Sequence, residues 1–208
     1  MTDGNKLTQG LILAFQTRDR KERPGLFFIV SGPSGVGKNT LLNYALREVQ
    51  GIYYLPSITT RPMRLGETQG SPYFFVTSSE FEAMIAQGAF LEWKKIHTGD
   101  YYGTHLPTIT CALANGYDII TDMDVLGCME VMARFPENVV SIFIAPPDRE
   151  ELRQRLAGRE KDPVLTARRL ERVDLEMSYM DRYRHVIVND DLGQAGAELV
   201  QILKQYSR

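Results

Sequence analysis

The chain has 208 residues, of which 43% are hydrophobic and 24% are charged, and its formal net charge at pH 7 is −2. This length suits one domain with a sizeable core, and the composition is that of a folded globular protein rather than a disordered, fibrous or membrane-embedded one. The lack of a basic excess argues against nucleic acid as a partner. No stretch approaches the ~20 apolar residues that span a bilayer, so we expect a cytoplasmic protein with no membrane partner. Cys111 and Cys128 lack metal or redox spacing and are expected to be buried free thiols.

The predicted elements begin after an N-terminal extension, residues 1–25, which ends in the turn-prone segment RDRKERPG. The apolar run LFFIV (26–30) predicts a buried strand, and a glycine-rich turn follows it directly. NTLLNYALREV (39–49) then predicts a helix, because its apolar residues recur at helical spacing. The order strand, loop, helix is therefore expected at the start of the domain.

The same alternation continues toward the C-terminus. Further strands are predicted at 117–124, 139–146 and 184–190, and further helices at 125–134, from about residue 148, and at 191–206. Apolar strands that alternate with helices predict an α/β fold, in which helices cover both faces of a parallel sheet. Ligands of such folds bind at the carboxyl ends of the strands.

Two segments interrupt this alternation. Residues 53–110 are rich in Tyr, Thr, Gly and Phe and have strand-like pieces around a helix predicted at 78–87, which indicates an inserted α+β lobe. Residues 151–178 hold two arginine-rich helical segments separated by the polar turn AGREKDP, which is typical of a mobile lid. We therefore expect one domain over 26–208, with its core at 26–52, 111–150 and 179–208.

The glycine-rich turn has the chemistry of a phosphate site. A strand that leads through such a turn into a helix gathers backbone N–H groups around one point, and the helix dipole adds positive potential there. GPSGVGKNT (32–40) matches the phosphate-loop pattern in this context, with Lys38 as the point charge for the β- and γ-phosphates. Asn39 stands where Ser or Thr usually offers a hydroxyl to Mg²⁺, but its amide oxygen is also a hard ligand. Thr40 cannot take over that direction, because one residue turns a helix by about 100°.

The inserted lobe offers groups for a phosphate and for a base. Arg61 and Arg64 lie three residues apart and Tyr73 follows them, and two guanidinium groups with a phenol can hold one phosphate. Glu92 offers a carboxylate, which accepts well from the N1–H and the exocyclic amine that only guanine presents together. Taken singly, the arginines would be surface charges and the tyrosines lobe core.

Together these motifs resemble the guanylate kinase family. The resemblance runs from about Leu26 to the C-terminus, through GPSGVGKNT, SITTRPMRLGE, FLEW, YYGT, TDMDVLG, LRQRLAGRE and VIVNDD. It implies a P-loop kinase core, a GMP-binding lobe at 53–110 and a lid at 151–178. The implied reaction is Mg²⁺-assisted phosphorylation of GMP, and of dGMP, to the diphosphate, with ATP as the donor.

The resemblance also implies roles for individual residues. The implied ATP-binding residues are Gly32, Pro33, Ser34, Gly35, Val36, Gly37, Lys38, Asn39, Thr40 and Asn189. The implied GMP-binding residues are Ser57, Arg61, Arg64, Tyr73, Glu92, Tyr102, Thr104 and Asp124. The implied catalytic residues, which stabilise charge on the transferred group, are Lys38, Arg155, Arg159 and Arg169. The implied metal contacts, direct or through water, are Asn39 and Asp122.

The chain departs from the family pattern in a few places. Asn39 replaces the hydroxyl residue, and Leu126 stands where the family has Gln. The stretch between Glu92 and Tyr102 is longer by one residue than expected. The lid is shorter by one, which leaves the choice between Arg168 and Arg169 open. None of these changes removes a residue of the acceptor site.

Two other functions compete with this interpretation. A non-catalytic binding module of the same family would use the GMP cleft for a phosphorylated or acidic peptide, but it could dispense with Lys38 and the lid arginines, which this chain has. A kinase of the same fold for another phosphate acceptor is the second alternative, because specificity is a difference of affinities. The sequence leaves the oligomeric state open, and a homo-oligomer is among the options.

Overall fold

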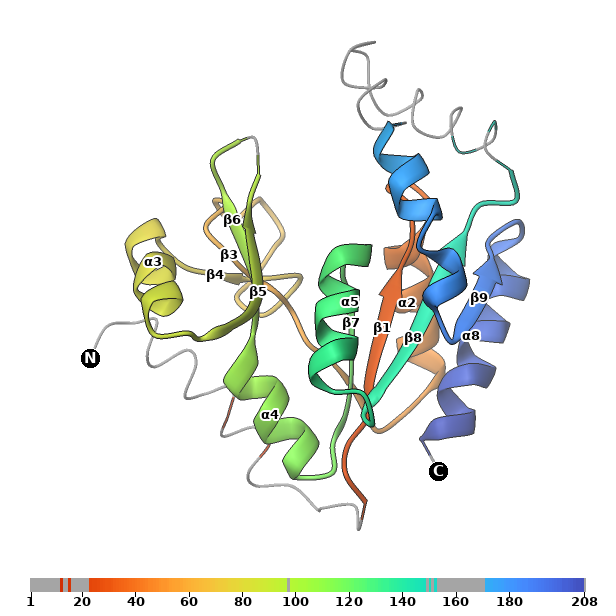
Figure 1. Ribbon diagram of the computed structural model, residues 1–208, viewed down its shortest axis with the longest axis horizontal. Helices are drawn as coiled ribbons and strands as arrows, with labels where there is room; N and C mark the ends of the chain where they lie inside the picture. The colour runs from red at the N-terminus through yellow and green to blue at the C-terminus, as the bar shows by residue number, and fades with distance from the viewer. Residues whose placement is uncertain are drawn as a thin grey trace. The chain divides into compact units, whose positions relative to one another are not determined.

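The computed structural model describes residues 23–96, 98–148 and 171–207, together with Ile12, Phe15, Glu150 and Leu152. These residues form two compact units (Figure 1). The first unit joins the described residues up to Gly25 with Tyr53–Ile119, and the second holds Leu26–Ile52 and the described residues from Ile120 onward. This partition into two units does not test the predicted division into extension, core, lobe and lid, which remains a prediction.

A five-stranded sheet has most of its residues in the second unit. Its strand order is β2 (Ile52–Tyr54), β7 (Asp118–Asp122), β1 (Phe27–Ser31), β8 (Val139–Ala145) and β9 (His185–Val188). β8 pairs in parallel with both β1 and β9. Every residue of β1 is buried, which explains why the strand is a continuous apolar run rather than an alternating one. The predicted α/β class with a parallel sheet is confirmed.

The helices of this unit follow the predicted apolar periodicity. α2 (Lys38–Glu48) buries Leu41, Leu42 and Ala45, and it packs against α8 (Leu192–Tyr206). α5 (Val125–Arg134) contacts β1 and β8. α8 begins at Asp191, whose side chain accepts a 2.9 Å hydrogen bond from the N–H of Gln194. Such a cap satisfies one of the N–H groups that every helix leaves free at its first turn.

The first unit contains a smaller, mixed sheet. Its strand order is β4 (Phe74–Phe75), β3 (Ile58–Thr59), β6 (Tyr101–His105) and β5 (Phe90–Lys95). β3 pairs in parallel with β4, whereas β6 is antiparallel to both β3 and β5. The helices of this unit are α3 (Ser78–Ala86) and α4 (Leu106–Ala114). The α+β character expected of the inserted segment is present.

Aromatic packing forms the core of this smaller sheet. Phe81 from α3 stacks on Phe90 with ring centroids 4.2 Å apart, and Ile58 and Met84 complete the buried cluster. α3 is held in register by a capping box, in which the side chain of Thr77 accepts from the backbone N–H of Glu80 and the Glu80 carboxylate accepts from the N–H of Thr77. The strands of the candidate acceptor site therefore rest on a rigid core.

The described part of the N-terminal extension packs into the first unit. The ring of Phe15 lies against Tyr53 and Tyr117, with centroids 5.7 and 5.4 Å away. Arg23 forms an ion pair of 2.8 Å with Asp118, whose side chain is fully buried. Phe15 and Arg23, two of the described residues of the extension, therefore pack against the unit's buried residues.

Candidate active site

The loop between β1 and α2 has the backbone of a phosphate site. Gly32, Gly35 and Gly37 have φ angles of 142°, 85° and 98°, which side chains rarely allow. A Cβ at Gly32 would lie 2.2 Å from the carbonyl oxygen of Ile144, so only glycine fits against β8 here. The predicted order of strand, glycine loop and helix is present, and the helix N-terminus faces the loop.

Lys38 folds back over this loop. Its Nζ donates to the carbonyl oxygens of Gly32 and Pro33 at 2.6 and 3.1 Å. Burial lowers the pKa of Lys38 below its usual value, and the nearby carboxylates of Glu176 and Asp122 oppose this shift. The ammonium group is thus held beside the loop, where it can meet phosphate oxygens.

Asn189 braces the loop from the end of β9. Its side-chain Nδ2 donates to the carbonyl oxygen of Val36 at 2.7 Å, and its backbone N–H donates to Ala145 at 2.9 Å. A Cβ at Gly37 would lie 2.6 Å from the same Nδ2 atom. This contact with the loop was not predicted from the sequence, where the family resemblance implies only that Asn189 binds ATP.

The candidate metal contacts lie at two neighbouring elements. Asn39 and Thr40 are exposed on the first turn of α2, and Asp122 ends β7. Within the described ranges, no group of three or more His, Cys, Asp or Glu side chains is arranged to hold a metal ion.

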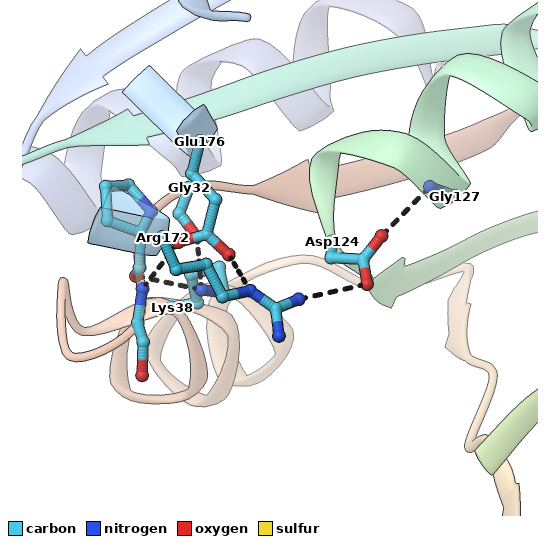
Figure 2. A network of polar contacts seen from close by, with 8 residues as sticks. Gly32, Lys38, Asp124, Gly127, Arg172 and Glu176 are labelled. Carbon is cyan, nitrogen blue, oxygen red and sulfur yellow. Dashed lines mark hydrogen bonds and ion pairs between the residues drawn. The ribbon is translucent and has the colours of Figure 1, made fainter. Parts of the chain in front are cut away.

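An acidic and basic network adjoins the loop (Figure 2). The N–H of Ser34 donates to Oε2 of Glu176 at 3.2 Å, and Nε of Arg172 donates to the other oxygen, Oε1, at 3.1 Å. Arg172 also reaches Oδ2 of Asp124 at 3.4 Å. The second oxygen of Asp124 caps α5 through the N–H of Gly127 at 2.9 Å. Sequence reasoning missed Glu176, since the Arg172–Glu176 spacing indicates only an ion pair along a helix.

In the first unit, Glu92 and Thr104 are brought together. They are partners across β5 and β6, and the hydroxyl of Thr104 donates to Oε1 of Glu92 at 2.6 Å. Ser57 precedes β3, where its carbonyl oxygen accepts from the N–H of Phe74 at 2.9 Å. Asp124, which is also among the predicted guanine contacts, belongs to the other unit.

The predicted phosphate holders of this unit also lie together. Arg61 is 5.5 Å from the ring centroid of Tyr73, and the ring of Tyr73 lies 5.6 Å from that of Tyr102. Glu67 accepts from Nη2 of Arg61 at 2.8 and 3.0 Å and from the N–H of Arg64 at 2.8 Å. The Glu67 hydrogen bond raises the pKa of Arg61, and the same bond lowers the pKa of Glu67. Glu67 therefore orients the guanidinium group that would meet a phosphate.

The predicted lid arginines, Arg155, Arg159 and Arg169, lie outside the described residues. Two described stretches flank that part of the chain. Leu152 is fully buried against Val173, and Met177 packs on the same pair. The helical segment 171–177, which carries Arg172 and Glu176, is thus tied to the start of the predicted lid.

Cys128 is a fully buried free thiol in α5, as expected. Burial raises the pKa of its thiol to about 11, which keeps the sulfur protonated at neutral pH. Cys111 is free as well but only partly buried. The described helices include none that is long and apolar enough to cross a membrane.

Comparison with known proteins identifies the family. A family model described as guanylate kinase matches residues 25–206. The chain belongs to the guanylate kinase family. Enzymes of this family phosphorylate GMP to GDP with ATP, and the resemblance of the sequence motifs to the family is thereby confirmed.

Individual relatives agree with the family model. The guanylate kinase of Symbiobacterium thermophilum is 44% identical over 180 residues, covering 86% of this chain and 84% of the relative. That of Mannheimia succiniciproducens is 43% identical over 183 residues, covering 86% and 88%. A crystal structure of guanylate kinase from Anaplasma phagocytophilum superposes with a TM-score of 0.69 at 31% identity, covering 89% of this chain and 87% of that one. The P-loop kinase fold is therefore shared along most of the chain.

Proposed function

We propose that this chain transfers the γ-phosphoryl group of ATP to GMP, and to dGMP, and that Mg²⁺ assists the transfer. The observation that carries this proposal is the presence in one chain of a formed phosphate loop with Lys38 and of a base-reading carboxylate, Glu92, held by Thr104. A non-catalytic binding module would not need both the phosphate loop with Lys38 and the carboxylate of Glu92. The family supports ATP and GMP as the substrates.

The reaction needs no residue that activates the nucleophile. An oxygen of the GMP phosphate is already anionic at neutral pH, and it attacks the γ-phosphorus in line while the bond to the β-phosphate oxygen breaks and ADP leaves. The chain's contribution is to position the two nucleotides and to stabilise the transferred charge. Lys38 supplies part of that charge beside the loop, and we assign the rest to Arg155, Arg159 and Arg169.

The oxygen ligands near the loop fit Mg²⁺. This ion is usually held by one or two carboxylates together with substrate phosphates and water. Asp122 offers the carboxylate at the end of β7, and the exposed amide of Asn39 offers a neutral oxygen on α2. When bound, the ion neutralises charge on the phosphate oxygens.

In this proposal, Glu92 selects the base of the acceptor nucleotide. Thr104 donates to Oε1 and so helps to orient the carboxylate, whose two oxygens are the acceptors that N1–H and N2–H of guanine require. Arg61, oriented by Glu67, and the phenols of Tyr73 and Tyr102 hold the GMP phosphate, together with Arg64. dGMP presents the same base and phosphate, so it is an acceptor as well.

The test is an assay of ADP release from MgATP, with GMP, dGMP, AMP, CMP and UMP as acceptors. We expect rapid turnover with GMP and dGMP alone. Lys38→Met should lower kcat at least about 100-fold, because one charge-stabilising group is lost, while the Kd of GMP measured by calorimetry changes less than about twofold. Turnover with AMP instead of GMP would contradict the assigned acceptor, and GMP binding without any turnover would favour the non-catalytic module.

A further inference from the structure

A carboxylate occupies part of the phosphate loop in this structure. Glu176 is 5% exposed, and its Oε2 accepts from the backbone N–H of Ser34, one of the groups that such a loop offers to phosphate oxygens. The contact joins residues 142 positions apart in the chain. Figure 2 shows the Glu176 carboxylate beside Lys38 at the loop.

The surroundings of this carboxylate are those of an anion site. The N-terminus of α2 and the ammonium group of Lys38 both favour negative charge at the loop. A half-buried cation is stabilised by negative charge close to it, and Glu176 is the carboxylate with the largest electrostatic effect on Lys38, ahead of Asp122 and Asp124. The other oxygen of Glu176 is held by Arg172.

We propose that Glu176 is a positioning residue of the donor site, whose carboxylate stands in for a phosphate group in the nucleotide-free protein and gives way when polyphosphate binds. This inference rests on the proposed donor role of the loop. It assigns to Glu176 a function that the reaction chemistry alone does not require.

Arg172 explains how the exchange can occur without leaving a buried charge unpaired. It already bridges Glu176 and Asp124, at 3.1 and 3.4 Å, and its side chain is 54% exposed. When a phosphate takes the N–H of Ser34, the Glu176 carboxylate keeps the guanidinium as its partner. Segment 171–177 packs on Leu152 through Val173, so the exchange acts on the contact between the described start and end of the predicted lid region.

The experiment compares Glu176→Gln with wild type in binding inorganic tripolyphosphate, which lacks base and sugar. The neutral amide keeps an oxygen that can accept from Ser34 but removes the competing negative charge. We expect the Kd of tripolyphosphate, measured by calorimetry, to fall about tenfold, whereas Glu171→Gln, an exposed change on the same helical segment, should leave it unchanged. Loss of a merely structural contact would weaken binding instead.

Equal or weaker binding by Glu176→Gln would overturn the inference. Hydrogen exchange on the wild-type protein provides a second measurement that needs no variant. Tripolyphosphate should increase protection of amides in 32–37 and decrease it in 171–177, and unchanged or increased protection of 171–177 would also overturn the inference. A wild-type protein that binds neither tripolyphosphate nor MgATP would instead refute the donor site itself, and with it the proposed function.

Discussion

At the scale of the residue, Glu92 and Thr104 form the proposed base-reading pair. Glu92→Gln replaces one acceptor oxygen with an amide that donates toward guanine's own donors. We expect kcat/KM for GMP to fall about 100-fold while the KM for MgATP changes less than about twofold. Steady-state kinetics with each nucleotide varied will measure this, and Glu130→Gln, an exposed change on α5, is the matched control. Equal losses with GMP and AMP would rule out a base-reading role.

His105 is a second residue for which we predict a measurable effect, in this case on the pH dependence of stability. It is buried at the end of β6, 2.7 Å from the hydroxyl of Thr108, and burial lowers the pKa of His105 to about 4 from an ordinary value of 6.5. Between these values the unfolded chain binds a proton that the folded protein does not, so stability falls as the pH drops from about 6.5 to about 4.

We expect wild type to lose about 2 kcal/mol more stability between pH 7 and pH 4 than His105→Gln does. Urea unfolding at a series of pH values, followed by circular dichroism, gives the two slopes. Parallel slopes for the two proteins would mean that His105 does not stay neutral in the folded state.

At the scale of the element, apolar runs and helical periodicity were sufficient to predict β1, β8, α2 and α8, because local burial alone determines them. β5 was not predicted as a strand, since it carries Glu92, Lys94 and Lys95, residue types that are depleted in strands. Its structure comes from antiparallel pairing with β6. The contact of Glu176 with Ser34 was likewise beyond local reasoning, because it joins residues 142 positions apart.

Gly103 of β6 lies against the aromatic rings of Phe90 in β5 and Phe81 in α3. A Cβ on this residue of β6 would lie 2.7 Å from Cδ1 of Phe90 and 3.0 Å from Cζ of Phe81. We expect Gly103→Ala to lower the free energy of unfolding by about 1–3 kcal/mol, because the stacked rings must shift. Phe90→Leu in the same chain should recover part of the loss, which a double-mutant cycle will measure. Additive losses would show that the rings do not limit the space at Gly103.

At the scale of the whole molecule, the described residues of the N-terminal extension pack into the fold. Arg23 forms an ion pair with the fully buried Asp118, so Arg23→Met removes one positive charge from beside that carboxylate. We expect a loss of about 2 kcal/mol in stability, whereas Arg47→Met, at an exposed position of α2, should cost less than about 0.5 kcal/mol. Denaturant unfolding of both variants gives the comparison, and equal effects would mean that the Arg23–Asp118 pair contributes no more to stability than an exposed arginine does.

The bracing of the phosphate loop has a thermodynamic consequence. Asn189 from the end of β9 and the close approach of Gly32 to Ile144 fix the loop's backbone from outside. Its conformational entropy is therefore lost when the protein folds, and not again each time a nucleotide arrives. Binding at such a preorganised loop therefore loses less conformational entropy than binding at a loop that must first order itself around the nucleotide.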